Sequence, residues 1–171
     1  LIILLSLLTS WSYAAHLVGG EISYRCLGGS NYEVRLIIYR DCRSTGAPFD
    51  NPAIITIYDG NNVLQGNYFV PLSSQRQLPN VAPNSCTALP SLACTEEGIY
   101  LDTISLAPNA SGYTLSHQRC CRNTSIANIP NPATWGSTYT IEIPPQSQSS
   151  TCNSSPQFSN PPPVALCLNR P

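Results

Sequence analysis

The segment YEVRLIIY, residues 32–39, is the clearest strand signal in the chain. Tyr32, Val34, Leu36 and Ile38 recur at every second position, with charged residues at positions 33 and 35. Successive side chains of a strand point to opposite faces, so these four apolar side chains share one face. The pattern therefore predicts a strand that buries this face against a core.

The same alternation predicts six further strands, at residues 17–26, 53–58, 63–70, 99–106, 112–120 and 137–143. The dipeptide Asp59-Gly60 favours a hairpin turn after the third strand, because glycine tolerates a positive φ. No helical period of useful length accompanies these strands. Seven short antiparallel strands predict an all-β, immunoglobulin-like β-sandwich over residues 15–143, and a closed β-barrel is the alternative.

An export signal is expected at the start of the chain. Residues 1–8 are almost entirely apolar, but a membrane-spanning helix needs about 20 such residues. Ser12 and Ala14 are small residues at the −3 and −1 positions of a cleavage site after Ala14. We therefore expect residues 1–14 to be a signal peptide, truncated at its start, and the protein to be secreted or held on the bacterial cell surface. A buried N-terminal strand is the alternative.

The cysteine content predicts disulfide bonds. The chain has eight cysteines, which are Cys26, Cys42, Cys86, Cys94, Cys120, Cys121, Cys152 and Cys167. An even number of cysteines behind an export signal is typical of disulfide pairing. Metal binding is the rival interpretation, but the sequence has no C-x-x-C pair and neither histidine has zinc-ligand spacing. We expect no metal and no cofactor.

Strand direction suggests one pairing. The second and sixth strands of such a sandwich run the same way, so Cys42 and the pair Cys120-Cys121 should lie at the same end. This predicts a disulfide from Cys42 to Cys120 or Cys121. Because neighbouring residues of a strand point to opposite faces, Cys120 and Cys121 are expected to have different partners.

Two segments interrupt the strand pattern. Residues 71–97 form a long connection that a Cys86–Cys94 disulfide would restrain. Residues 144–163 are rich in Pro, Ser and Gln and are expected to be a linker, and residues 164–171 look like the start of a truncated next domain. A Cys26–Cys152 disulfide is a weaker hypothesis. It follows because Cys26 is expected at the end of the sandwich where the seventh strand leaves toward Cys152.

Charge and motifs argue against several functions. With eight arginines, no lysine and a net charge of −1, the sequence lacks a basic patch for nucleic acid. His117 is expected to be structural, because no nucleophile elbow accompanies it. The adjacent Glu96 and Glu97 are expected in a solvated loop rather than as a catalytic pair. No catalytic residues are therefore predicted. Charged residues near the expected cysteine end are candidates for structural ion pairs, namely Arg40, Asp41, Arg119 and Arg122.

Several motifs together resemble a known family. They are HLVGGEI at 16–22, YRC at 24–26, YRDC at 39–42, EGIY at 97–100, QRCCRN at 118–123, NSSP at 153–156 and PPP at 161–163. This series resembles the N-terminal region of large secreted Bacteroidota proteins that carry a gliding-motility-associated C-terminal sorting domain, often with PKD or cadherin-like repeats. The resemblance implies export, type IX secretion and attachment to, or release from, the cell surface. The triplet at 102–104 resembles the Bacteroidota O-glycosylation pattern, so Thr103 is a candidate acceptor.

These observations predict a non-catalytic N-terminal module of an exported, multidomain surface or secreted protein. Adhesion or structure is the expected role. A link to gliding motility is implied by the family resemblance alone. The expected partners are an extracellular protein or glycan and downstream repeat domains of the same chain, with no nucleic acid and no membrane span in the mature chain. The alternative is an accessory or glycan-binding module of a secreted hydrolase, using Tyr68, Phe69, Trp135 and Tyr139 as stacking aromatics.

Overall fold

The computed structural model describes residues 16–44, 46–79, 94–145 and 152–161. The expected signal peptide, Cys86, Cys167 and the expected start of a further domain lie outside these residues. The strands are β1 Leu17–Gly28, β2 Asn31–Asp41, β3 Ala53–Asp59, β4 Leu64–Val70, β5 Leu72–Gln77, β6 Thr95–Ser105, β7 Tyr113–Cys120 and β8 Gly136–Ile143, with a 3-10 helix, η1, at Pro132–Thr134.

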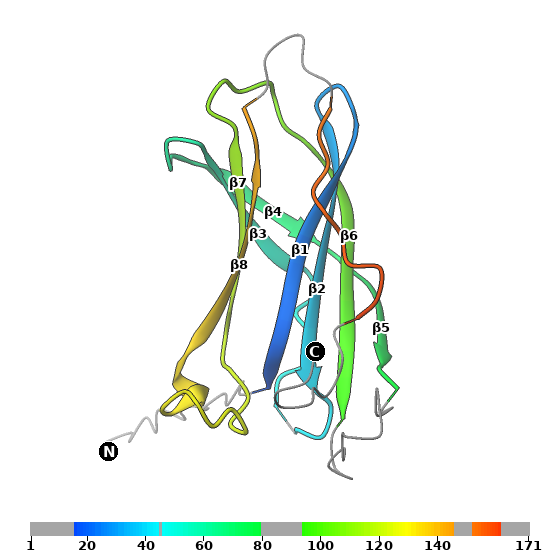
Figure 1. Ribbon diagram of the computed structural model, residues 1–171, viewed down its shortest axis with the longest axis vertical. Coiled ribbons are helices and arrows are strands. Elements are labelled where there is room, and N and C mark those ends of the chain that lie inside the picture. The colour runs from blue at the N-terminus through cyan, green and yellow to red at the C-terminus, as the bar shows by residue number, and fades with distance from the viewer. Residues whose placement is uncertain (1–15, 45, 80–93, 146–151, 162–171) are drawn as a thin grey trace, which may run out of the picture.

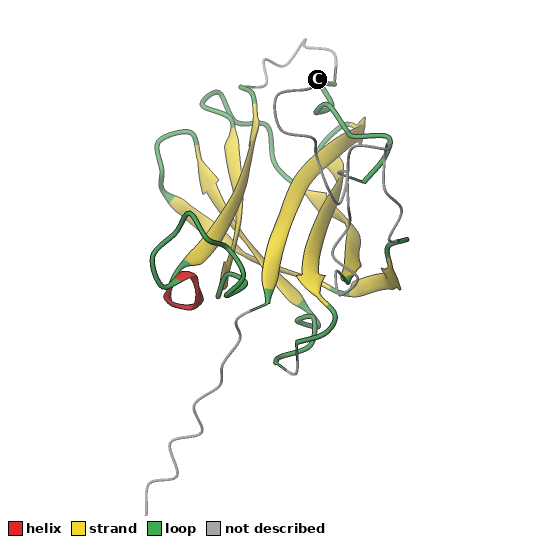
Figure 2. Ribbon diagram, turned by 60° about the horizontal axis from the view of Figure 1, so that its bottom comes forward, coloured by secondary structure: helices red, strands yellow, loops and turns green. Residues whose placement is uncertain are grey.

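These strands form two layers (Figures 1 and 2). The first sheet has the strand order β1-β2-β6-β5, and the second has the order β4-β3-β7-β8. All strand pairs within the sheets are antiparallel. Both sheets are open, so the predicted immunoglobulin-like sandwich is confirmed and the barrel alternative is wrong.

The core lies between the two sheets and contains the face that the sequence pattern marked. Val34, Leu36 and Ile38 are completely buried, and Tyr32 is 2% exposed. Full burial of such a side chain contributes about 1.5–3 kcal/mol to folding. Strand β2 supplies these residues from the interior of its sheet, between β1 and β6. A second apolar cluster of Ile37, Tyr39, Leu78 and partly buried Ile99 comes from the alternate positions, which face the other way.

The hairpin between β3 and β4 forms at Asp59-Gly60, but the glycine does not supply the positive φ on which the prediction rested. Asp59 Oδ1 accepts hydrogen bonds from the backbone N–H groups of Asn61 and Val63, each at 2.9 Å. Asn62 takes up the positive φ, at 62°. The aspartate thus holds the turn with its side chain, and no ligand is needed to explain its position.

The structure differs from the predicted strands in the segment 71–97. Strand β5 was missed because its sequence, LSSQRQ, is almost entirely polar and shows no alternation. Strand β6 begins at Thr95 rather than at residue 99. Glu96 and Glu97 therefore lie in a strand and not in the expected solvated loop, and Glu97 is only 2% exposed.

The helical content of the described residues is confined to one short 3-10 turn, shown in red in Figure 2. No helix among these residues has the length and apolar character that crossing a membrane requires.

Candidate functional site

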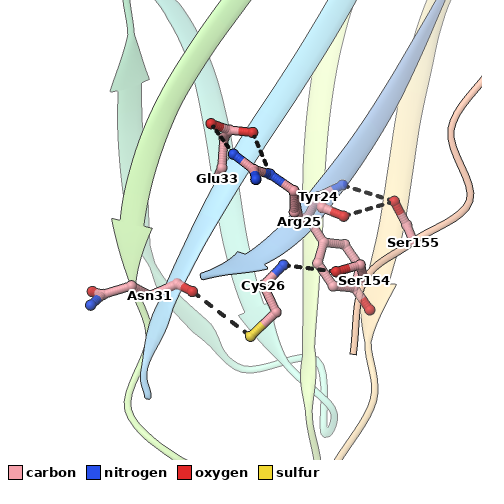
Figure 3. Close-up of polar contacts among 7 residues, drawn as sticks. All are labelled: Tyr24, Arg25, Cys26, Asn31, Glu33, Ser154 and Ser155. Atoms are coloured by element: carbon pink, nitrogen blue, oxygen red, sulfur yellow. Dashed lines mark hydrogen bonds and ion pairs between the residues drawn. The ribbon is translucent and has the colours of Figure 1, made fainter. Parts of the chain in front are cut away.

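The segment 152–161, called the strap here, is fastened to the outer edge of β1 (Figure 3). A Cys26–Cys152 disulfide, with a Cα–Cα distance of 5.7 Å, joins the two covalently. The backbone N–H of Ser155 donates to the carbonyl of Tyr24 at 3.0 Å, and Tyr24 N–H donates to Ser155 Oγ at 2.9 Å. Ser154 Oγ accepts from the N–H of Cys26 at 3.0 Å. The disulfide between Cys26 and Cys152, which was the weaker of the pairing hypotheses, is therefore formed. Part of the expected linker, residues 152–161, is held against the sandwich.

The strap makes one backbone hydrogen bond to β1, from the Ser155 N–H, and uses serine hydroxyls for contacts that a further strand would make with its backbone. It runs antiparallel to β1, because Ser154 lies at Cys26 and Ser155 at Tyr24. In an antiparallel pair, every second residue directs its N–H and C=O away from its partner strand. Pro156 follows at once and has no N–H to donate. The strap therefore forms hydrogen bonds with the backbone of β1 near the β1–β2 hairpin, and then diverges from β1.

A groove of about 630 Å³ opens where the strap and β1 diverge. Its walls are residues 18–21 of β1 and the strap residues Phe158, Asn160 and Pro161, and Tyr39, Leu78 and Thr95 complete the lining. The Tyr39 hydroxyl is buried and has no hydrogen-bond partner among the described residues. Burial raises the pKa of Tyr39 to about 12 and also raises the pKa of Glu21. The groove is thus a largely apolar space that has Glu21 and the buried Tyr39 hydroxyl in its lining.

The other disulfides lie at the end of the sandwich where β2 stops. Cys42 pairs with Cys94 at a Cα–Cα distance of 5.5 Å, and Cys120 pairs with Cys121 at 3.1 Å through a cis peptide bond. The predicted bridges from Cys42 to Cys120 or Cys121, and from Cys86 to Cys94, are wrong.

Both corrections have a structural reason. Asp41 pairs with Thr95 across β2 and β6, so the residues that follow and precede them, Cys42 and Cys94, meet at the same end. The prediction placed Cys94 in a loop because it began that strand too late. Strand β7 ends at Cys120, so the alternation of side chains that separates neighbouring cysteines does not extend to Cys121.

The four predicted ion-pair residues lie at this cysteine end, and two of them, Arg40 and Arg119, form ion pairs. Arg40 pairs with Glu96 and also donates to the carbonyl of Ala47 at 2.7 Å, and its guanidinium lies 5.2 Å from the ring centre of Phe49. Arg119 pairs with Asp50 at 3.4 Å.

The other two predicted residues make neutral contacts. Asp41 Oδ2 accepts from Asn123 Nδ2 at 3.0 Å, and Arg122 Nε donates to the carbonyl of Gly136 at 3.0 Å. Within the described part of the chain, Asp41 and Arg122 therefore do not form the ion pairs predicted for them. These groups satisfy one another and the backbone, which is the pattern of a structural corner.

The remaining candidates also take structural positions. His117 is buried, its Nδ1 lies 2.8 Å from the carbonyl oxygen of Ile54, and burial lowers its pKa. This agrees with the predicted hydrogen-bonded structural histidine. Trp135 and Phe69 are exposed but come from opposite edges of the second sheet, so they do not form one stacking platform. Thr103 is exposed on β6, and its modification stays a prediction.

No group of three or more histidine, cysteine, aspartate or glutamate side chains in the described parts of the chain is arranged to hold a metal ion. No protein-family model, curated protein or solved structure matches the chain. The fold itself defines the class: an all-β, immunoglobulin-like sandwich of two open antiparallel sheets stapled by disulfides.

Proposed function

We propose that the chain is a non-catalytic module of an exported bacterial surface or secreted protein, with a role in adhesion or structure. The observation that carries the proposal is the Cys26–Cys152 disulfide, which ties the strap to the first strand. In the chain-entropy picture, a bridge that closes so long a loop stabilises the fold by roughly 5 kcal/mol. Such a bridge persists in an oxidising compartment, which supports export.

The structural roles of the charged and histidine side chains support a non-catalytic role. Arg40, Arg119 and His117 contact neighbouring protein groups, and the groove beside β1 is largely apolar. The motif series that resembles the N-terminal region of large Bacteroidota surface proteins supports the placement of the module in a longer chain, with gliding motility as one process it could serve.

The first test is the oxidation state after export. Peptide mapping without reduction should recover Cys26 linked to Cys152, and Cys42 linked to Cys94. Recovery of Cys26 as a free thiol from exported protein would remove the observation on which the proposal rests.

The second test separates adhesion from the alternative, an accessory module of a hydrolase. Residues 16–161 are deleted from the gene in its bacterial host, and export, attachment of cells to surfaces and polysaccharide hydrolysis by the culture are measured. An adhesive or structural module predicts reduced attachment with unchanged hydrolysis. Unchanged attachment together with reduced hydrolysis would support the accessory role instead. Restoring the natural gene is the control.

A further inference from the structure

The Cys26–Cys152 disulfide links the first strand of the sandwich to the segment that leaves it. The two cysteines are 126 residues apart in sequence. Residues 27–151, which include β2 to β8, therefore lie within one covalently closed loop. The chain enters β1 at Leu17, before this loop begins, and continues through the strap, after the loop has closed.

We propose that the module transmits mechanical tension through β1 alone. A pull on the two ends of the chain passes from Leu17 along β1 to Cys26, crosses the disulfide to Cys152 and continues through the strap. Strands β2 to β8 lie off this path and bear no tension along their backbone. The inference rests on the proposed function, because tension arises when a module links a cell surface to something outside it.

The geometry of β1 suits such a path. The strand begins at one end of the sandwich, and its hairpin to β2 lies at the other end (Figure 1). A strand is already extended, at about 3.3 Å per residue, so the stretch from Leu17 to Cys26 spans about 30 Å and lengthens little under load. The pull enters and leaves at the two ends of this one strand, so it runs along the strand axis and puts no net load on the ladder between β1 and β2.

The start of β1 is also held firmly. The N–H of Leu17 donates to the carbonyl of Cys121 at 3.1 Å, and its own carbonyl accepts from the N–H of Asn123 at 2.9 Å. From there, β1 pairs with β2 along its length, as far as Gly28 opposite Asn31. Ile22 and Tyr24 anchor the same strand in the core between the sheets.

The strap beyond Cys152 is held much less firmly. Among the described residues, its hydrogen bonds with β1 are those of Asn153, Ser154 and Ser155 with Tyr24 and Cys26, and Phe158 is 76% exposed. Under tension we expect the strap to detach first and to lengthen the chain slightly. The pull then reaches the disulfide, and the extension stops there.

Force spectroscopy on single molecules tests this inference. The exported, oxidised chain is held by peptide tags at its two ends and stretched, first without and then with dithiothreitol. Without reductant we expect only the short extension of the terminal segments. After full reduction, unfolding should release the 126 residue steps of the loop, which at about 3.6 Å each amount to about 450 Å.

Two variants complete the test. The double variant Cys26→Ser/Cys152→Ser should extend further than the unchanged chain under force alone. The matched control is Cys42→Ser/Cys94→Ser, whose bridge lies inside the loop, and it should show only the short extension until reductant is added. If the double variant at 26 and 152 does not fold, the reductant experiment on the unchanged chain still decides the question.

A release of hundreds of ångströms from the oxidised, unchanged chain would overturn the inference. The deletion experiment on attachment reads out the proposed function separately. Loss of attachment combined with a long release would retain the adhesive role and reject the tension path. A short extension combined with normal attachment would retain the tension path and reject the adhesive role.

Discussion

The carboxylate of Glu97 on β6 accepts a hydrogen bond of 2.7 Å from Nε of Arg76 on the neighbouring edge strand β5. The two side chains differ strongly in exposure, because 63% of the arginine side chain but only 3% of the glutamate side chain is accessible. The positive charge of Arg76 on the edge strand thus lies beside the buried carboxylate of Glu97 on the neighbouring strand. The exposed arginine is the counter-charge that makes the buried carboxylate tolerable.

Removal of Arg76 should therefore cost more than a surface substitution usually does. We expect Arg76→Gln to lower the free energy of unfolding, because the buried Glu97 carboxylate loses its counter-charge. Urea denaturation at neutral pH measures the change. In the double variant Arg76→Gln/Glu97→Gln, much of the loss should return, because no buried charge is left. Equal stability of Arg76→Gln and the unchanged protein would contradict this account.

Tyr39 and Tyr100 offer a matched pair of substitutions. The buried Tyr39 hydroxyl has no hydrogen-bond partner among the described residues, whereas the Tyr100 hydroxyl donates to the carbonyl of Asp50 at 2.8 Å. Tyr39→Phe should be neutral or stabilising, and Tyr100→Phe should destabilise by about 1 kcal/mol. Thermal unfolding of both variants gives the comparison, and a larger loss for Tyr39→Phe would show that its hydroxyl is satisfied in solution.

Alkaline pH should destabilise the fold through these same tyrosines. Burial raises the pKa of Tyr39 and of Tyr100 to about 12, from an ordinary value of 10.0. Between these two values, the unfolded chain loses its phenolic protons and the folded chain keeps them. Stability should thus be full below pH 10 and should fall as the pH rises toward 12. Denaturation curves across this range test the sign, and Tyr39→Phe should flatten the decline.

Acidic pH should act through His117, whose pKa is lowered by burial despite the contact with Ile54. The unfolded chain therefore takes up this proton at a higher pH than the folded chain does. The contribution of His117 is fully present above its ordinary pKa of 6.5 and is lost as the pH falls below it. A titration of the imidazole signals by NMR should place His117 below this value. A midpoint above it would reverse the sign of the prediction.

The strap contacts can be tested at a single hydroxyl. Ser155 Oγ lies 2.9 Å from the amide nitrogen of Tyr24, and Ser155→Ala removes this acceptor. We expect the amide hydrogen of Tyr24 to exchange faster with solvent by several-fold, because a bond of about 1 kcal/mol is lost. Ser159→Ala, a change elsewhere in the strap, is the control and should leave this amide unaffected. Equal exchange in both variants would mean that the contact is not formed in solution.

The sandwich was predictable where burial imposes a strict period. Strand β2 alternates because one face meets the core, and its apolar residues identified that face correctly. Strand β5 could not be found in this way, since an edge strand that is mostly exposed needs no apolar face. The late start predicted for β6 has a similar origin, because the first strand residues include the charged Glu96 and Glu97, and Glu97 is paired with Arg76.

The cysteine pairings were harder to predict than the strands. The argument from strand direction correctly placed Cys42 and Cys120 at one end, but it could not choose among cysteines that gather there. That choice depends on the residues at which β6 begins and β7 ends, and the alternation of apolar and polar residues does not define these positions. The strap was missed as an ordered segment for another reason: Ser154 and Ser155 bind β1 through hydroxyl groups, and such contacts leave no periodic pattern in the sequence.

The strap also affects how copies of the protein behave toward one another. An open strand edge offers unpaired N–H and C=O groups on which a second molecule can build a continuous sheet. At Tyr24 and Cys26 that edge is already occupied by serines of the same chain, and the disulfide keeps them beside it at a high effective concentration. The bridge that closes the loop therefore also discourages copies of the protein from joining edge to edge into a continuous sheet.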